Sequence, residues 1–153
     1  MSDVHTAEIR SKNMSAIRAK GNKSTELKLL AILKAAHITG WRRHDRRVYG
    51  TPDFSFQDRK LAIFIDGCFW HKCPLDYKPP KTNREFWDTK VTVNQVRDEL
   101  VTNTLRERGW QVLRIWEHEL KKDTTVVKEQ LNTLLNPKSS RIRTILNVWR
   151  QTR

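Results

Sequence analysis

The chain has 153 residues, which is enough for one domain with a buried core. It carries 30 Lys and Arg against 17 Asp and Glu, a net charge of +13 that is spread along its length. A folded domain this basic favours a polyanionic partner, and nucleic acid is the expected one. No apolar run approaches the roughly 18 residues that cross a bilayer, and no signal-peptide block opens the chain. A membrane role is therefore excluded and a cytoplasmic location is expected.

The first elements are a basic arm and a helix. Residues 1–22 are expected to form a basic arm or helix that contacts DNA, with a frayed terminus as the alternative, and residues 23–153 a single endonuclease domain. Ser24 or Thr25 can cap the helix that follows, with Leu27 and Leu30 on one apolar face. Glu26 lies in its first turn, where the helix dipole favours a carboxylate whatever else it does.

A hairpin is predicted next, after a basic and extended stretch at 41–48. Residues 53–56 alternate polar and apolar, as a half-buried strand does, and 57–59 form a turn. The apolar run at 61–66 then pairs antiparallel with 53–56. This hairpin brings Asp53 beside Ile65 and Asp66.

The second half alternates helices and strands. A helix is predicted from 84 to 108, ended by Gly109, then a strand at 110–116, a helix at 123–135 and a last helix after Pro137. The long helix carries apolar residues at helical spacing: Trp87, Val91, Val96, Leu100, Val101 and Leu105. In the last helix, Ile142, Ile145, Leu146 and Trp149 share one face. The order predicts a mixed sheet with helices on its faces, that is, an α/β or α+β domain, and we take it as α/β.

Acidic residues and one histidine suggest phosphodiester hydrolysis. Asp53, Glu26 and the Asp66 region supply the oxygen ligands that Mg²⁺ prefers, and a phosphate substrate would supply more. A metal there would stabilise charge on the phosphate and acidify a water. His71, whose ordinary pKa lies near neutrality, is a candidate general base.

The loop after the apolar strand holds two cysteines and two aromatics. Cys68 and Cys73 are spaced for a structural zinc site, with His118 and Asp76 as candidate partners. The alternative is two buried free thiols, because a cytoplasmic disulfide is not expected. From the residues alone, core packing is favoured for the loop aromatics and for Trp87; the alternative is wedging between base pairs.

Several motifs together resemble the very short patch repair endonucleases. They are Gly50-Thr51-Pro52-Asp53-Phe54, Phe64-Ile65-Asp66-Gly67-Cys68-Phe69-Trp70-His71, Glu85-Phe86-Trp87, Asn94 with Arg97-Asp98, Gly109-Trp110 and Trp116-Glu117. Arg10-Ser11-Lys12-Asn13-Met14 is similar to the N-terminal segment of the same family. The similarity covers residues 3 to 120 in the right order.

The resemblance implies a restriction-endonuclease-like fold of the PD-(D/E)xK type with a structural zinc. It implies a Mg²⁺-dependent nick 5′ to the thymine of a T·G mismatch left by deamination of 5-methylcytosine. Residue by residue, it makes Asp53 a magnesium ligand and lets Ile65 lend its backbone carbonyl. It makes His71 the group that activates water, and Glu26 an acid that supports the site. It also reverses the interpretation of three aromatics, which become the residues that intercalate beside the mismatch: Phe69, Trp70 and Trp87.

Three departures from the family pattern affect the site. Asp66 stands where the best-known members have a histidine, so it could be a direct metal ligand here. The Cys68-to-Cys73 loop is shorter and lacks a histidine-rich run. His118 takes the place of a cysteine ligand, with Asp76 as the candidate fourth ligand. If Asp76 cannot reach the zinc, His71 could be drawn into that site instead.

The resulting expectation is a bacterial mismatch endonuclease acting as a monomer on mismatched double-stranded DNA, associated with the nucleoid when acting. Mismatch-repair accessory proteins are candidate partners. Two alternatives remain open. One is a related restriction or homing-type enzyme that makes double-strand breaks. The other is a zinc-stapled DNA-binding module whose nuclease site has decayed through the change at Asp66.

Overall fold

A four-stranded mixed sheet forms the centre of the molecule in the computed structural model, which describes Glu8 and residues 24–136. The strand order is β1 (Trp41–Arg43), β2 (Phe54–Phe56), β3 (Leu61–Asp66) and β4 (Gln111–Trp116). The first three strands pair antiparallel, and β4 lies parallel to β3. The predicted hairpin is confirmed, with Phe54 opposite Ile63 and a short 3-10 helix, η1 (Gln57–Arg59), at the turn.

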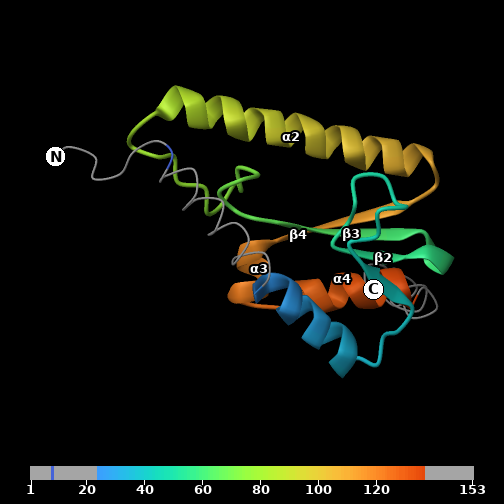
Figure 1. The fold of residues 1–153 in the computed structure, drawn as a ribbon. Helices are drawn as coiled ribbons and strands as arrows, with labels where there is room; N and C mark the ends of the chain where they lie inside the picture. Colours follow the sequence, from blue (N-terminus) through green and yellow to red (C-terminus); the bar gives the residue numbers. More distant parts are fainter. Residues whose placement is uncertain (1–7, 9–23, 137–153) are drawn as a thin grey trace, which may run out of the picture.

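Helices cover both faces of the sheet, as Figure 1 shows. The long helix α2 (Arg84–Glu107) lies along one face. A helix at 24–35, α3 (Glu117–Lys121) and α4 (Thr125–Leu135) lie on the other. The mixed α/β architecture with flanking helices is therefore confirmed. In the described part of the chain, no helix is both long enough and apolar enough to cross a membrane.

Strand β3 is buried on both faces, and its alternation divides the core in two. Leu61, Ile63 and Ile65 join the larger cluster, which includes Leu29, Leu33 and the apolar residues of α3 and α4. Ala62 and Phe64 join the smaller cluster under α2. By the same period of two, Asp66 faces α2 at the end of the strand. The apolar alternation thus places a carboxylate under the long helix.

The segment between β1 and β2 approaches α2 closely. Gly50 has φ +78°, and a Cβ atom built there would lie 2.3 Å from Cγ1 of Val101. Both the backbone conformation and the contact therefore require glycine. Asp45, behind this segment, accepts hydrogen bonds from Arg47, Ser55 and Gln57. These contacts fix the chain that leads into Asp53.

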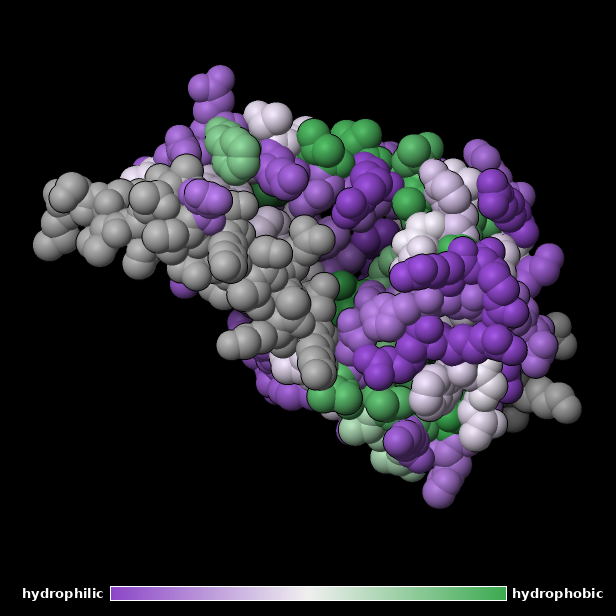
Figure 2. Space-filling view, in the orientation of Figure 1, coloured by the Kyte–Doolittle hydropathy of each residue, from purple (hydrophilic) through white to green (hydrophobic). Residues whose placement is uncertain are grey.

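Two details of the predicted elements are wrong, and the apolar residues of the long helix divide between two faces. Strand β2 is buried throughout, because Ser55 bonds to Asp45 instead of facing solvent. Leu27 is 48% exposed, and the 24–35 helix packs through Leu29 and Leu33 instead. On α2, Val96 and Leu100 lie in an exposed apolar row with Val93 and Phe86, visible along the upper edge in Figure 2. The basic arm at 1–22, apart from Glu8, and the expected helix after Pro137 lie outside the described residues.

Candidate functional site

Asp53 is the first element of the candidate site, and its position follows from the hairpin. It directly precedes β2, and its Oδ2 accepts a 2.7 Å hydrogen bond from the backbone N–H of Ile65 on β3. Burial raises the pKa of Asp53 to about 6; the Ile65 hydrogen bond opposes this shift and the charge of Glu26 adds to it. A partly buried carboxylate that resists ionisation is a good place for a cation.

Glu26 and His44 lie beside Asp53. One oxygen of Glu26 bonds to Nε2 of His44 at 2.9 Å and to the guanidinium of Arg43 at 2.5 Å. Glu26, His44 and Asp53 form one of three groups of side chains, within the described residues, whose spacing could hold a metal ion. Ligand oxygens from two carboxylates and a nitrogen from His44 meet there. A divalent cation fits this donor set.

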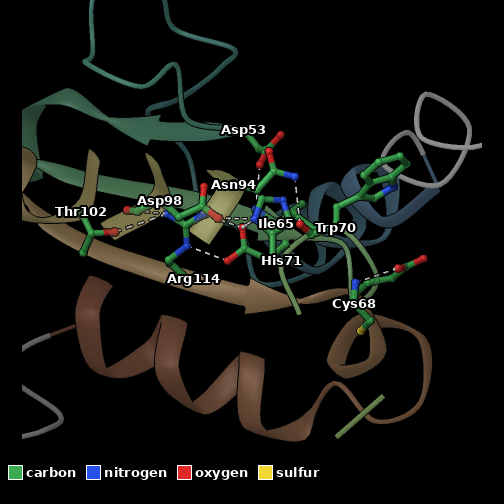
Figure 3. Close-up of polar contacts among 11 residues, drawn as sticks. Asp53, Ile65, Cys68, Trp70, His71, Asn94, Asp98, Thr102 and Arg114 are labelled. Atoms are coloured by element: carbon green, nitrogen blue, oxygen red, sulfur yellow. Dashed lines mark hydrogen bonds and ion pairs between the residues drawn. The ribbon is translucent and has the colours of Figure 1, made fainter. Parts of the chain in front are cut away.

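A second group comprises His71, Asp98 and Asp66 (Figure 3). Nδ1 of His71 hydrogen-bonds to Oδ2 of Asp98 on α2 and lies 3.8 Å from Oδ1 of Asp66. Burial opposes ionisation of Asp98, but its hydrogen bond to His71 and the charges of His71 and Arg114 lower its pKa. Asp98 therefore stays ionised and holds Nδ1 of His71, which leaves Nε2 as the free ring nitrogen.

Both carboxylate oxygens of Asp66 accept hydrogen bonds from an arginine. Arg114 on β4 donates to both carboxylate oxygens, from Nε at 2.6 Å and from Nη2 at 2.7 Å. The side chain of Asp66 is only 6% exposed. Arg114 therefore competes with a cation for Asp66, although the carboxylate keeps lone pairs that the arginine does not use. The role of Asp66 as a direct metal ligand stays a prediction.

The third group lies apart from the first two, between the 67–77 loop and α3. It comprises Cys68, Cys73 and His118. The two Sγ atoms lie 3.3 and 3.4 Å from Nδ1 of His118. Zn–S bonds of about 2.3 Å and Zn–N bonds of about 2.0 Å set ligand atoms roughly 3.5 Å apart in a tetrahedron, so these donors fit zinc.

Asp76 reaches the same group. Its Oδ2 lies 3.7 Å from Nδ1 of His118, and it also forms an ion pair with Lys122 at 2.8 Å. His71 takes no part, because Asp98 holds it. The donors that group together are thus Cys68, Cys73 and His118, and Asp76 as a fourth zinc ligand stays a prediction.

The aromatic side chains form one half-buried cluster at the loop and the start of α2. Ring centroids of Phe69 lie 5.2 Å from Trp70 and 5.5 Å from Trp87, in edge-to-face arrangements. Asn94 on α2 donates to the backbone carbonyl of Trp70 and fixes this part of the loop (Figure 3). Phe86, 57% exposed, continues the cluster outward. None of the three predicted aromatics is in the sheet core.

Three residues with roles in this geometry had no predicted role: His44, Asp98 and Arg114. His44 and Asp98 come from segments far from their partners in sequence, so only the tertiary fold joins them. The role of Arg114 could have been predicted, because it is a charged residue inside an alternating strand, β4, and the neighbouring strand β3 ends in an acid.

Comparisons with known proteins agree with this arrangement. The sequence profile of the DNA mismatch endonuclease Vsr family matches residues 2–75. The chain is similar to the type II nicking enzyme V.NmeDIP of Neisseria meningitidis, with 38% identity over 89% of this chain and 92% of that protein. It is also similar to the DNA mismatch endonuclease Vsr of Escherichia coli, with 37% identity over 88% of this chain and 86% of that protein. It is 42% identical to the type II nicking enzyme V.NaeI of Lentzea aerocolonigenes, over 72% of this chain and 68% of that protein.

Similarity of this extent, over 68–92% of the length of relatives that are themselves nucleases, is enough to assign the family. The chain belongs to the DNA mismatch endonuclease Vsr family and is a DNA endonuclease.

Proposed function

We propose that this endonuclease cuts one strand of duplex DNA 5′ to the thymine of a T·G mismatch, with Mg²⁺ at Asp53. The observation that carries the proposal is the hydrogen bond from the Ile65 backbone to the partly buried Asp53 carboxylate, next to Asp66 on β3, whose Oδ1 lies 3.8 Å from Nδ1 of His71. A cation ligand and a general base at the same end of one strand supply what phosphodiester hydrolysis requires. The names of the relatives, mismatch endonuclease and nicking enzymes, support the same activity.

The metal would be held by Asp53 and the backbone carbonyl of Ile65, with Glu26 supporting the site. When bound, Mg²⁺ would supply charge stabilisation for the phosphate and a lower pKa for a water. Nε2 of His71 takes a proton from the attacking water, while Asp98 keeps Nδ1 protonated and the ring oriented. The basic surface binds the phosphate backbone.

Zinc and the aromatic cluster complete the proposal. Zinc held by Cys68, Cys73, His118 and Asp76 would attach the 67–77 loop to α3, a structural task. The loop presents Phe69 and Trp70, with Trp87 behind them, to stack against unpaired bases beside the mismatch. The topology of the sheet is consistent with the restriction-endonuclease-like fold of the PD-(D/E)xK type, which we propose for this domain.

The test is cleavage of a labelled duplex with one T·G mismatch, beside matched T·A and C·G duplexes, with Mg²⁺ and with EDTA. A Mg²⁺-dependent nick next to the mismatched thymine, absent from both matched duplexes, is expected. Asp53→Asn should abolish the nick and keep DNA binding, whereas Asp58→Asn, an exposed acid on η1, should change neither.

Other products would point elsewhere. Equal cutting of matched and mismatched duplexes, or cuts in both strands, would favour a restriction or homing-type activity. Tight binding to the mismatch without any cutting would favour a DNA-binding module with a decayed nuclease site.

A further inference from the structure

Arg114 contacts both carboxylates of the His71 group. It donates to both oxygens of Asp66, and its Nη2 lies 3.1 Å from Oδ1 of Asp98. Its Nη1 donates to the backbone carbonyl of Asp98 at 3.4 Å and to the hydroxyl of Thr102 at 3.3 Å. All three guanidinium nitrogens of Arg114 therefore have hydrogen-bond partners. The Phe64 ring also packs against the guanidinium, with 4.9 Å between Cζ of Arg114 and the ring centroid.

These contacts join three elements. Asp66 ends β3, Arg114 lies in β4, and Asp98 and Thr102 lie on α2. The parallel register puts Asp66 opposite Trp116 and Phe64 opposite Arg114, so Arg114 lies two residue pairs in from the end of the strands, facing α2. Asp98 uses Oδ1 for Arg114 and Oδ2 for His71. The position of His71 is thus set by the sheet through one arginine and one aspartate.

We propose that Asp66 and Arg114 form a fixed ion pair that positions Asp98, and through it His71, for the hydrolytic step. Asp66 then anchors an arginine and does not bind the metal. This inference rests on the proposed function for its kinetic part only. A planar guanidinium with two carboxylate partners has a defined orientation, which a lysine or a neutral side chain cannot reproduce.

A simpler role for Arg114 would be to neutralise the buried charge of Asp66. A double variant distinguishes charge neutralisation from positioning. Arg114→Gln leaves two carboxylates without their counter-charge. Asp66→Asn with Arg114→Gln removes that repulsion but does not restore the hold on Asp98. Neutralisation predicts that the double variant recovers the wild-type cleavage rate, and positioning predicts that it does not.

The experiment measures single-turnover cleavage at saturating mismatched DNA, the Kd for DNA with EDTA, and thermal melting of each variant. Arg114→Gln should lower the cleavage rate roughly ten- to a hundredfold with little change in Kd, the range seen when groups that orient site residues are removed. The double variant should melt near wild type and stay slow. Arg106→Gln, an exposed arginine near the end of α2, loses the same charge and should cut at the wild-type rate.

A spectroscopic readout tests the positioning directly. In long-range ¹H–¹⁵N spectra, His71, identified by its loss in His71→Gln, should show a proton fixed on Nδ1 in wild type. In Arg114→Gln this signal should give way to an average of the two tautomers. Should Arg114→Gln fail to fold, Arg114→Lys keeps the charge and carries the same test, with slow cleavage at an unchanged melting temperature expected.

Three results would overturn the proposal: a double variant with the wild-type rate, a folded Arg114→Gln or Arg114→Lys that cuts at full rate, or an unchanged His71 spectrum. If the wild-type protein does not cut mismatched DNA, the proposed function fails, while the His71 spectra still decide whether Arg114 positions the ring.

Discussion

Asp53 combines two properties that oppose each other in the absence of a cation. Its carboxylate lies in a largely buried position, and its Oδ2 is fixed by the Ile65 backbone. Burial raises its pKa from 3.8 to about 6, so at neutral pH the ionised form costs folding free energy. The ionised Asp53 carboxylate thus lowers the free energy of unfolding, as groups at functional sites commonly do.

Asp53→Asn should therefore stabilise the metal-free protein at pH 7.5. The shift to about 6 corresponds to an upper limit of about 3 kcal/mol, and we expect roughly 1–2 kcal/mol, because the amide oxygen still accepts from Ile65. The sign follows from linkage: with a raised pKa, the contribution of Asp53 to stability is complete below pH 3.8 and is lost as pH rises through about 6.

The measurement is the difference in unfolding free energy between wild type and Asp53→Asn, in EDTA, from pH 4 to pH 8. The difference should be greatest above pH 7 and should vanish toward pH 4. Asp58→Asn, at an exposed position, should show no such trend. A difference that does not depend on pH would contradict the assignment of the shift to Asp53.

For individual residues, the sequence predicted contacts between segments that are close along the chain. A short turn between two strands predicts that Asp53 lies beside Ile65, and in the structure the Ile65 backbone N–H donates to the Asp53 carboxylate. The partners of Asp66 and His71 could not be predicted, because Arg114 is 48 residues from Asp66 and Asp98 is 27 from His71. Such pairs depend on how α2 lies across the sheet, which no local pattern specifies.

Between the residue and the whole molecule, the 67–77 loop depends on the elements at its two sides. It has no regular hydrogen-bonded structure of its own apart from turns, and α3 has only five residues. Cys68 and Cys73 from the loop meet His118 from α3. One bound ion would therefore hold together two elements that are each too short to be stable alone.

Zinc removal should destabilise this region first. We expect one Zn²⁺ per chain, retained in His118→Cys, lost in His118→Ala, and held less tightly in Asp76→Ala. Burial raises the pKa of the Cys68 thiol to about 11 without metal, so zinc binding at neutral pH should release its proton. Strong chelation should lower the melting temperature by roughly 10 °C, as a loss of a few kcal/mol does in a domain of this size.

Metal content by elemental analysis, proton release in weak buffer and thermal melting check these outcomes. His37→Asn, an exposed histidine away from the group, is the matched control and should bind zinc as wild type does. A metal-free protein that melts at the wild-type temperature would instead favour two buried thiols.

The elements themselves were largely predictable, with one instructive failure. The limits of α2 and β4 were predicted to within a residue or two, because Gly109 and the change of period mark them. The sequence did not predict which face of α2 packs on the sheet. Val96 and Leu100 have helical spacing, yet they lie on its exposed side, while Val101 and Leu105 pack on the sheet. Helical spacing gives an apolar stripe but does not say which of two stripes faces the core.

Across the whole molecule, different elements hold the Asp53 side and the His71 side of the candidate site. Asp53 belongs to the antiparallel hairpin, whereas His71 depends on Asp98 and Arg114, from the long helix and the parallel strand. The two halves meet at β3, the strand that is buried on both faces. A single set of catalytic groups in one chain can attack only one phosphodiester at a time.

The enzyme should therefore nick, and a monomer should be sufficient. On supercoiled plasmid carrying one T·G mismatch, open circles should accumulate fully before any linear DNA forms, because a second cut requires a second, independent event. At limiting enzyme, the initial rate should rise in proportion to protein concentration, whereas an obligate dimer gives a steeper dependence. The rate should also fall steeply between about 50 and 200 mM salt, because a chain of charge +13 releases counterions from the phosphates it contacts. Linear DNA that appears without a preceding open circle, or a second-order dependence on protein, would show that two copies act together on opposite strands.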